Sequence, residues 1–228
     1  MTPGIIAFTV IYLILLCAYF VTAPSGKMYL RAPNKILMAL MFFIFALVSW
    51  FTKGYSSSSY HTVLIVSLFM LMIGDIFLLV DFNRGGDFFL GGNVALAAYE
   101  ICFLLDHGVS FKQFWWFLIP PFLIMCLYAF FFFKLTNIFK MKESYRIPFL
   151  FYLFSVTLHG SAGLAICIFC PQYALLGAGS MLFMMSDWEI MFDRFVFKSP
   201  WTLRLNALLY FVGLLLIVLS MQLCPLFK

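Results

Sequence analysis

Eight long apolar runs divide this chain of 228 residues, and each is close to the length that a helix needs to cross a membrane. A crossing helix needs about 17–25 apolar residues, because each residue adds about 1.5 Å and the hydrocarbon layer is about 30 Å thick. A membrane-spanning barrel would alternate apolar and polar residues, whereas residues 130–133 are all phenylalanine. We therefore predict an all-α polytopic transmembrane bundle of about eight helices. The predicted helices cover residues 5–21, 35–51, 61–80, 88–105, 114–133, 147–169, 174–192 and 201–223.

The charged residues support this class and predict an orientation. Only 10% of the residues are charged and the mean hydropathy is +1.06, far from the values of soluble domains. Eleven of the fourteen Lys and Arg residues fall in the loops that follow the first, third, fifth and seventh predicted helices. Because basic residues in short loops stay in the cytoplasm, we expect these loops to be cytoplasmic and both termini to be on the other side. The net charge of +5 favours contact with acidic lipid headgroups and not with nucleic acid, because the basic residues form no groove-sized patch.

Motifs for metal, cofactor or serine chemistry do not occur in the sequence. The three histidines lack the spacing of a His-Glu-x-x-His site, and the single Cys-x-x-Cys, at Cys167 and Cys170, has no second pair. No Gly-x-Ser-x-Gly motif occurs. We therefore predict neither a metal nor a cofactor.

Two aspartates lie within apolar runs at matching depths. Asp75 and Asp187 each stand five residues before the end of a predicted helix that enters from the outside, which places both roughly 8 Å inside the cytoplasmic boundary. A charged side chain in the hydrocarbon costs about 2.5–3.5 kcal/mol, so an acid there usually faces a polar interior. The pair either holds helices together through hydrogen bonds or performs chemistry in one pocket open to the cytoplasm. In the second case one acid can keep its proton as a general acid while the other stays ionised.

The spacing of these aspartates also suggests an internal repeat. They stand 112 residues apart in a chain of 228, and each follows a small residue and precedes another aspartate after six positions. We treat residues 1–228 as one membrane domain. Duplication of a four-helix unit, 1–114 and 115–228, is one interpretation, and the copies would then be parallel. Chance spacing is the other.

Further polar residues complete the candidate site. Glu100 lies inside an apolar run and needs either a partner or a proton, and His159 lies among small residues, where packing and catalysis are both open. Arg31, Lys35 and Arg84 lie at the predicted cytoplasmic border. They either mark the topology or hold a phosphate headgroup above the two aspartates.

Several motifs together resemble the YhhN-like lysoplasmalogenase family of eight-helix membrane proteins. The motif nearest the carboxyl end runs from Gly177 through Phe183 to Ser186 and Asp187, and continues to Asp193, Arg194 and Phe195. Other matching positions are Gly74 with Asp75, Arg31 with Pro33, Pro148 with Tyr152, and residues 210–220 of the last helix. Two positions depart from the family pattern. A histidine typical of the fourth helix aligns with Tyr99 or Glu100, and a glutamine of the last helix aligns with Leu214.

The resemblance implies hydrolysis of the vinyl ether bond of a lysoplasmalogen, with a lysophospholipid as substrate and no cofactor. The products are a long-chain aldehyde and glycerophosphoethanolamine or glycerophosphocholine. Asp75 and Asp187 would be the catalytic pair, one as proton donor and the other as the group that stabilises the cation and activates water. Glu100, His159 or Tyr99 would replace the missing histidine, unless the activity has been lost. The rival interpretations are a proton-coupled transporter of lipid or small molecules and a non-catalytic lipid-binding homologue.

Overall fold

The computed structural model describes residues 2–25, 27–55, 59–80, 82–134, 146–195 and 199–224, and these residues form eight α-helices without a β-strand. The predicted all-α bundle is therefore confirmed, and each apolar run corresponds to one helix, although α3 ends at Phe77 and not at residue 80. Six helices, α1, α2, α3, α4, α6 and α8, are long and apolar enough to cross a membrane, which supports a multi-pass membrane protein. The α-helices are α1 Pro3–Thr22, α2 Met28–Thr52, α3 Ser59–Phe77, α4 Phe82–Asp106, α5 Phe111–Lys134, α6 Arg146–Phe169, α7 Ala174–Phe195 and α8 Pro200–Leu223, with short 3-10 turns at η1 Ala23–Ser25 and η4 Pro171–Tyr173.

Local sequence signals explain several helix ends. Pro3 and Pro200 lie in the first turns of α1 and α8, where a missing N–H does no harm. The Ser199 side chain accepts a hydrogen bond from the Trp201 amide at 3.2 Å, which caps the start of α8. Gly54 follows α2 with a φ of 74°, a left-handed conformation that glycine adopts without strain.

The start of α2 lies seven residues earlier than the sequence indicated. The prediction began this helix at Lys35 because charged residues were assigned to a loop, whereas α2 begins at Met28 and includes both Arg31 and Lys35. Lys35 can lie within the helical bundle because its ammonium group is paired inside it, as shown below. Helix α4 likewise begins earlier than predicted, at Phe82, which is six residues before the predicted start.

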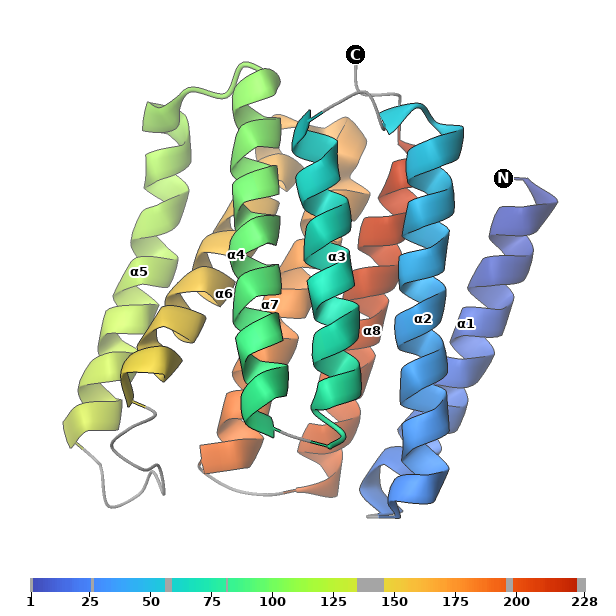
Figure 1. Cartoon of the computed structure of the whole chain (residues 1–228). Helices are drawn as coiled ribbons and strands as arrows, with labels where there is room; N and C mark the ends of the chain where they lie inside the picture. The colour runs from blue at the N-terminus through green and yellow to red at the C-terminus, as the bar shows by residue number, and fades with distance from the viewer. Residues whose placement is uncertain are drawn as a thin grey trace.

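Six helices pack in a closed cyclic order that we call the six-helix ring: α2, α3, α4, α6, α7 and α8, with α8 returning to α2. In Figure 1 α2, α3 and α4 lie side by side in front, with α7 and α8 behind. Helix α1 packs outside the ring against α2 and α8, and α5 packs against α6. Exchanging α2, α3 and α4 for α6, α7 and α8 leaves this order unchanged. The order is compatible with duplication of a four-helix unit, which stays one of the two interpretations of the sequence.

Close backbone contacts set the spacing of α7 within the ring. A Cβ atom on Gly179 would lie 2.7 Å from the carbonyl oxygen of Gly213 on α8, and one on Gly163 of α6 would lie 2.8 Å from that of Gly177. Only glycine allows such an approach, which is the usual way for membrane helices to pack tightly. Helix α7 is therefore fixed against both neighbours.

The polarity of the bundle is inverted relative to a soluble protein. Large apolar side chains cover the outside, with Ile14 61% exposed and Val21 71% exposed. Charged and polar side chains are buried inside, and several are completely enclosed. Such an arrangement suits a protein surrounded by lipid, because a polar group facing hydrocarbon would lose its hydrogen bonds. The enclosed polar side chains include Asp75, Asn93, Glu100, His159, Ser180 and Asp187.

Candidate active site inside the six-helix ring

Asp75 is held by a cation and a hydroxyl group from two neighbouring helices. The Nζ atom of Lys35 on α2 lies 3.0 Å from Asp75 Oδ1, and the Tyr210 hydroxyl on α8 donates to Asp75 Oδ2 at 2.7 Å. The Asp75 side chain is 1% exposed and that of Lys35 is 14% exposed. A buried carboxylate is stable when a cation and hydrogen-bond donors surround it, so this arrangement suits an ionised Asp75.

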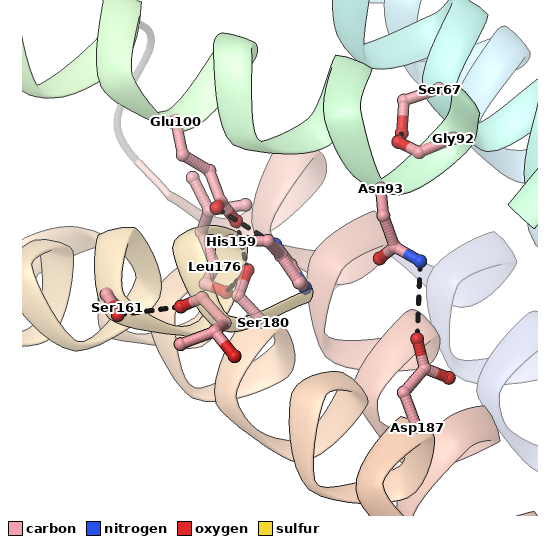
Figure 2. Close-up of polar contacts among 10 residues, drawn as sticks. Ser67, Gly92, Asn93, Glu100, His159, Ser161, Leu176, Ser180 and Asp187 are labelled. Atoms are coloured by element: carbon pink, nitrogen blue, oxygen red, sulfur yellow. Dashed lines mark hydrogen bonds and ion pairs between the residues drawn. The ribbon is translucent and has the colours of Figure 1, made fainter. Parts of the chain in front are cut away.

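Asp187 has a different set of partners. The Nδ2 atom of Asn93 on α4 donates to Asp187 Oδ2 at 3.2 Å, a contact drawn in Figure 2. The hydroxyl of Tyr152 on α6 faces the same carboxyl group. Both of these partners are neutral donors, and Asp187 is fully buried. Asn93 therefore contacts the candidate catalytic acid.

The two aspartates belong to one interior. Asp75 lies close enough to Asp187 for its charge to act on it, and Tyr210 lies within the field of both carboxyl groups. The Phe183 ring, one turn before Asp187 on α7, packs edge-on against the Tyr210 ring with centroids 5.1 Å apart. Tyr210 and Phe183 thus connect the surroundings of the two acids.

A second polar cluster surrounds Glu100. His159 Nδ1 lies 2.9 Å from Glu100 Oε2, and Ser180 Oγ donates to Glu100 Oε1. Figure 2 shows this cluster beside the contact between Asn93 and Asp187. All three side chains of the cluster are enclosed. Glu100 thus has the partner that a buried acid requires.

Three helices each contribute one polar side chain to each cluster, and the two side chains on a helix are seven residues apart. Seven residues make about two helical turns, or roughly 10 Å, so each helix presents two polar side chains on one face. Helix α7 is antiparallel to α4 and α6. Its two polar residues therefore occur in the opposite order along the chain. The pairs are Asn93 and Glu100 on α4, Tyr152 and His159 on α6, and Asp187 and Ser180 on α7.

The other predicted site residues lie in three different places. Lys35, which was predicted at the cytoplasmic border, is paired with Asp75 inside the bundle. Arg31, one turn earlier on α2, is half-buried and lies near Lys35, whereas Arg84 is exposed near the start of α4. Tyr99 packs among aromatic rings, with its centroid 6.0 Å from that of Tyr60.

A family comparison covers the residues that form this interior. The model of the YhhN family matches residues 30–221. The chain belongs to the YhhN family. The matched segment extends from the start of α2 almost to the end of α8, so it includes every residue of both clusters. No curated protein matches the chain, and no solved structure matches it.

Proposed function

We propose that this YhhN family protein hydrolyses the vinyl ether bond of lysoplasmalogens, with Asp187 as proton donor and Asp75 as the ionised carboxylate. One observation carries the proposal: two buried aspartates share one interior but have partners of different charge. Asp75 is paired with the Lys35 ammonium, and Asp187 faces the neutral side chains of Asn93 and Tyr152.

The charge balance assigns the two roles. Lys35 and Asp75 together are neutral, so a negative charge on Asp187 would add a second anion without its own cation. An uncompensated charge in a buried site costs several kcal/mol, and a proton on Asp187 removes that cost. A carboxyl group that keeps its proton beside one that stays ionised is the arrangement of acid-catalysed ether and glycoside hydrolysis.

The reaction follows from these two states. Asp187 gives its proton to the alkenyl carbon that is not bonded to oxygen, and the double bond becomes an oxocarbenium ion. The negative charge of Asp75 stabilises this cation, an effect that is strong in a buried site. Water then adds to the cationic carbon, and the hemiacetal collapses to the aldehyde and the free glycerol hydroxyl. One water molecule is consumed, and no other reactant is needed.

A lipid substrate would reach the buried acids from the bilayer. An apolar depression on α2 is lined by Tyr29, Ala32, Pro33, Ile36 and Leu37, in the same turns of the helix as Lys35. The alkenyl chain would enter along this part of α2, while Arg31 and Arg84 would meet the phosphate at the cytoplasmic border. Because Asp75 and Asp187 are closed off from the surroundings, entry requires neighbouring helices to separate.

The test is product release by the purified protein from three matched lysophospholipids: a vinyl ether, an alkyl ether and an ester. We expect aldehyde from the vinyl ether and no cleavage of the alkyl ether, because only the vinyl ether forms an oxocarbenium ion when its carbon is protonated. Cleavage of the ester alone would contradict the proposal, as would the absence of any product. A transporter would instead show pH-driven flux in sealed vesicles, and a binding protein would show thermal stabilisation by the lipid without turnover.

A further inference from the structure

His159 has one ring nitrogen that the described residues leave without a partner. Its Nδ1 atom is bonded to Glu100, which fixes the ring, whereas Nε2 is buried and forms no hydrogen bond with any described residue. The side chain is fully enclosed. A buried polar nitrogen without a partner is costly, so this atom needs either water or a reacting group.

The edge of the His159 ring that carries Nε2 lies between the two polar clusters. The His159 ring packs edge-on against Phe183, with centroids 5.3 Å apart. Phe183 stands three residues after Ser180 and four before Asp187, so it occupies the level between them. His159 is also close enough to Asp187 for charge on one to act on the other. The imidazole therefore extends from Glu100 toward the acid proposed as proton donor.

A second buried atom without a partner among the described residues lies in the contact between Asn93 and Asp187. Asn93 donates to Asp187 through Nδ2, while its Oδ1 atom is buried and accepts no hydrogen bond from the described residues. An N–H on His159 Nε2 and the acceptor on Asn93 are complementary. Together with Asp187 they provide the two to four polar partners that a buried water molecule needs.

The geometry points to Glu100 and His159 as a proton relay that recharges Asp187 and accepts the proton of the attacking water. This inference rests on the proposed hydrolysis and adds two residues to it. Glu100 acts as a positioning residue, since it holds the ring through Nδ1, and Nε2 is the atom that exchanges protons. The same division of work occurs wherever a buried carboxylate orients a histidine base.

The proton balance closes at every step. At rest, the imidazolium and the Glu100 carboxylate form a neutral pair, and Asp187 holds its proton. After Asp187 has protonated the alkenyl carbon, Nε2 passes its proton to Asp187, which leaves a neutral imidazole beside the Glu100 carboxylate. Water then bonds to the cationic carbon and gives its proton to Nε2, and the resting state returns. The net charge of the interior together with the substrate is the same at every step.

Hydrogen exchange into unreacted substrate tests the relay, because a purely structural role for His159 would not produce it. In the wild type the oxocarbenium ion is captured by water, so substrate recovered from D2O should contain no deuterium. In His159→Asn the amide can still donate to Glu100, but the imidazole that would accept the proton of the attacking water is missing. The cation should then return its proton to Asp187. We expect kcat to fall by about 10²–10⁴-fold, the usual contribution of a general base, and deuterium to appear at the protonated alkenyl carbon of the recovered substrate.

Two further variants keep the test decisive. The double variant His159→Asn with Glu100→Gln carries no charge at this cluster, so it should fold even if the single variant does not, and it should show the same slow turnover and exchange. Ser161→Ala is the matched control, because Ser161 is buried on the same helix and bonds only to the Thr157 carbonyl oxygen in the described structure. It should keep wild-type turnover and show no exchange.

The outcomes separate this inference from the proposed function. If the wild type releases no aldehyde from a lysoplasmalogen, both are wrong. If the wild type is active and the histidine variants either keep its kcat or lose turnover without deuterium exchange, the relay is wrong and the hydrolysis stands.

Discussion

The buried ion pair between Lys35 and Asp75 should contribute strongly to stability. Replacing Lys35 by methionine keeps the length and apolar stem of the side chain but leaves the Asp75 carboxylate, 1% exposed, with the Tyr210 hydroxyl as its remaining partner. Removal of one member of a buried pair costs about 3–5 kcal/mol. Since Lys35 is 14% exposed, we expect a loss near the lower end, about 3 kcal/mol or roughly a hundredfold in the folding equilibrium.

The assay is a double-mutant cycle measured by equilibrium unfolding in lipid-detergent micelles. Lys35→Met, Asp75→Asn and the double variant are compared, because the cycle isolates the coupling between the two side chains. We expect the double variant to lose less stability than the sum of the single losses, since it leaves no unpaired charge. The same change at Lys112, an exposed residue on α5, is the control and should alter stability by less than about 0.5 kcal/mol. A loss below about 1 kcal/mol in Lys35→Met, or strictly additive losses, would refute the argument from buried charge.

Three other changes test separate parts of the structure. Tyr210→Phe removes the hydrogen bond to Asp75 Oδ2 but keeps the ring contacts, and unfolding should show a loss of about 1.5–3 kcal/mol; an unchanged midpoint would mean that this bond is not formed. Gly179→Ala places a methyl group 2.7 Å from the Gly213 carbonyl oxygen, so it should destabilise the protein by about 1–3 kcal/mol, whereas Gly86→Ala, with no atom within 4 Å, should cost nothing. Equal effects of the two glycine changes would disprove the close contact of α7 and α8. In a cysteine-free background, Ser110→Cys should react with an impermeant maleimide on intact cells and Arg84→Cys should not; the reverse pattern would invert the proposed orientation.

The helices could be predicted because the membrane leaves the chain few alternatives. Every backbone N–H and C=O group inside hydrocarbon must be satisfied within the segment, so each long apolar run becomes a helix whatever its neighbours are. The ends of the helices were harder to predict. Charged residues such as Arg31 and Lys35 usually indicate a loop, although both lie in α2. The order of the six-helix ring depends on contacts between side chains of distant segments, and the apolar runs carry no signal for it.

The candidate site could be predicted only through its acids. Asp75, Glu100 and Asp187 are conspicuous because a carboxyl group in an apolar run is costly. Their partners are ordinary residues: Tyr210 on α8 and Asn93 on α4 give no sign, in the sequence, of the acid that each contacts. One signal was available, since Asn93 and Glu100, like Ser180 and Asp187, are separated by seven residues and must share a helix face.

The initial rate of aldehyde release by Asp187→Asn tests the central claim most directly. Asparagine fills the same space and can still bond to Asn93, but it cannot protonate the alkenyl carbon. We predict that purified Asp187→Asn, with unfolding behaviour like that of the wild type, releases aldehyde from a lysoplasmalogen at least about a hundredfold more slowly. Asp87→Asn, an exposed residue on α4, should keep the wild-type rate. Wild-type aldehyde release by Asp187→Asn would contradict the assignment of this buried acid as the proton donor.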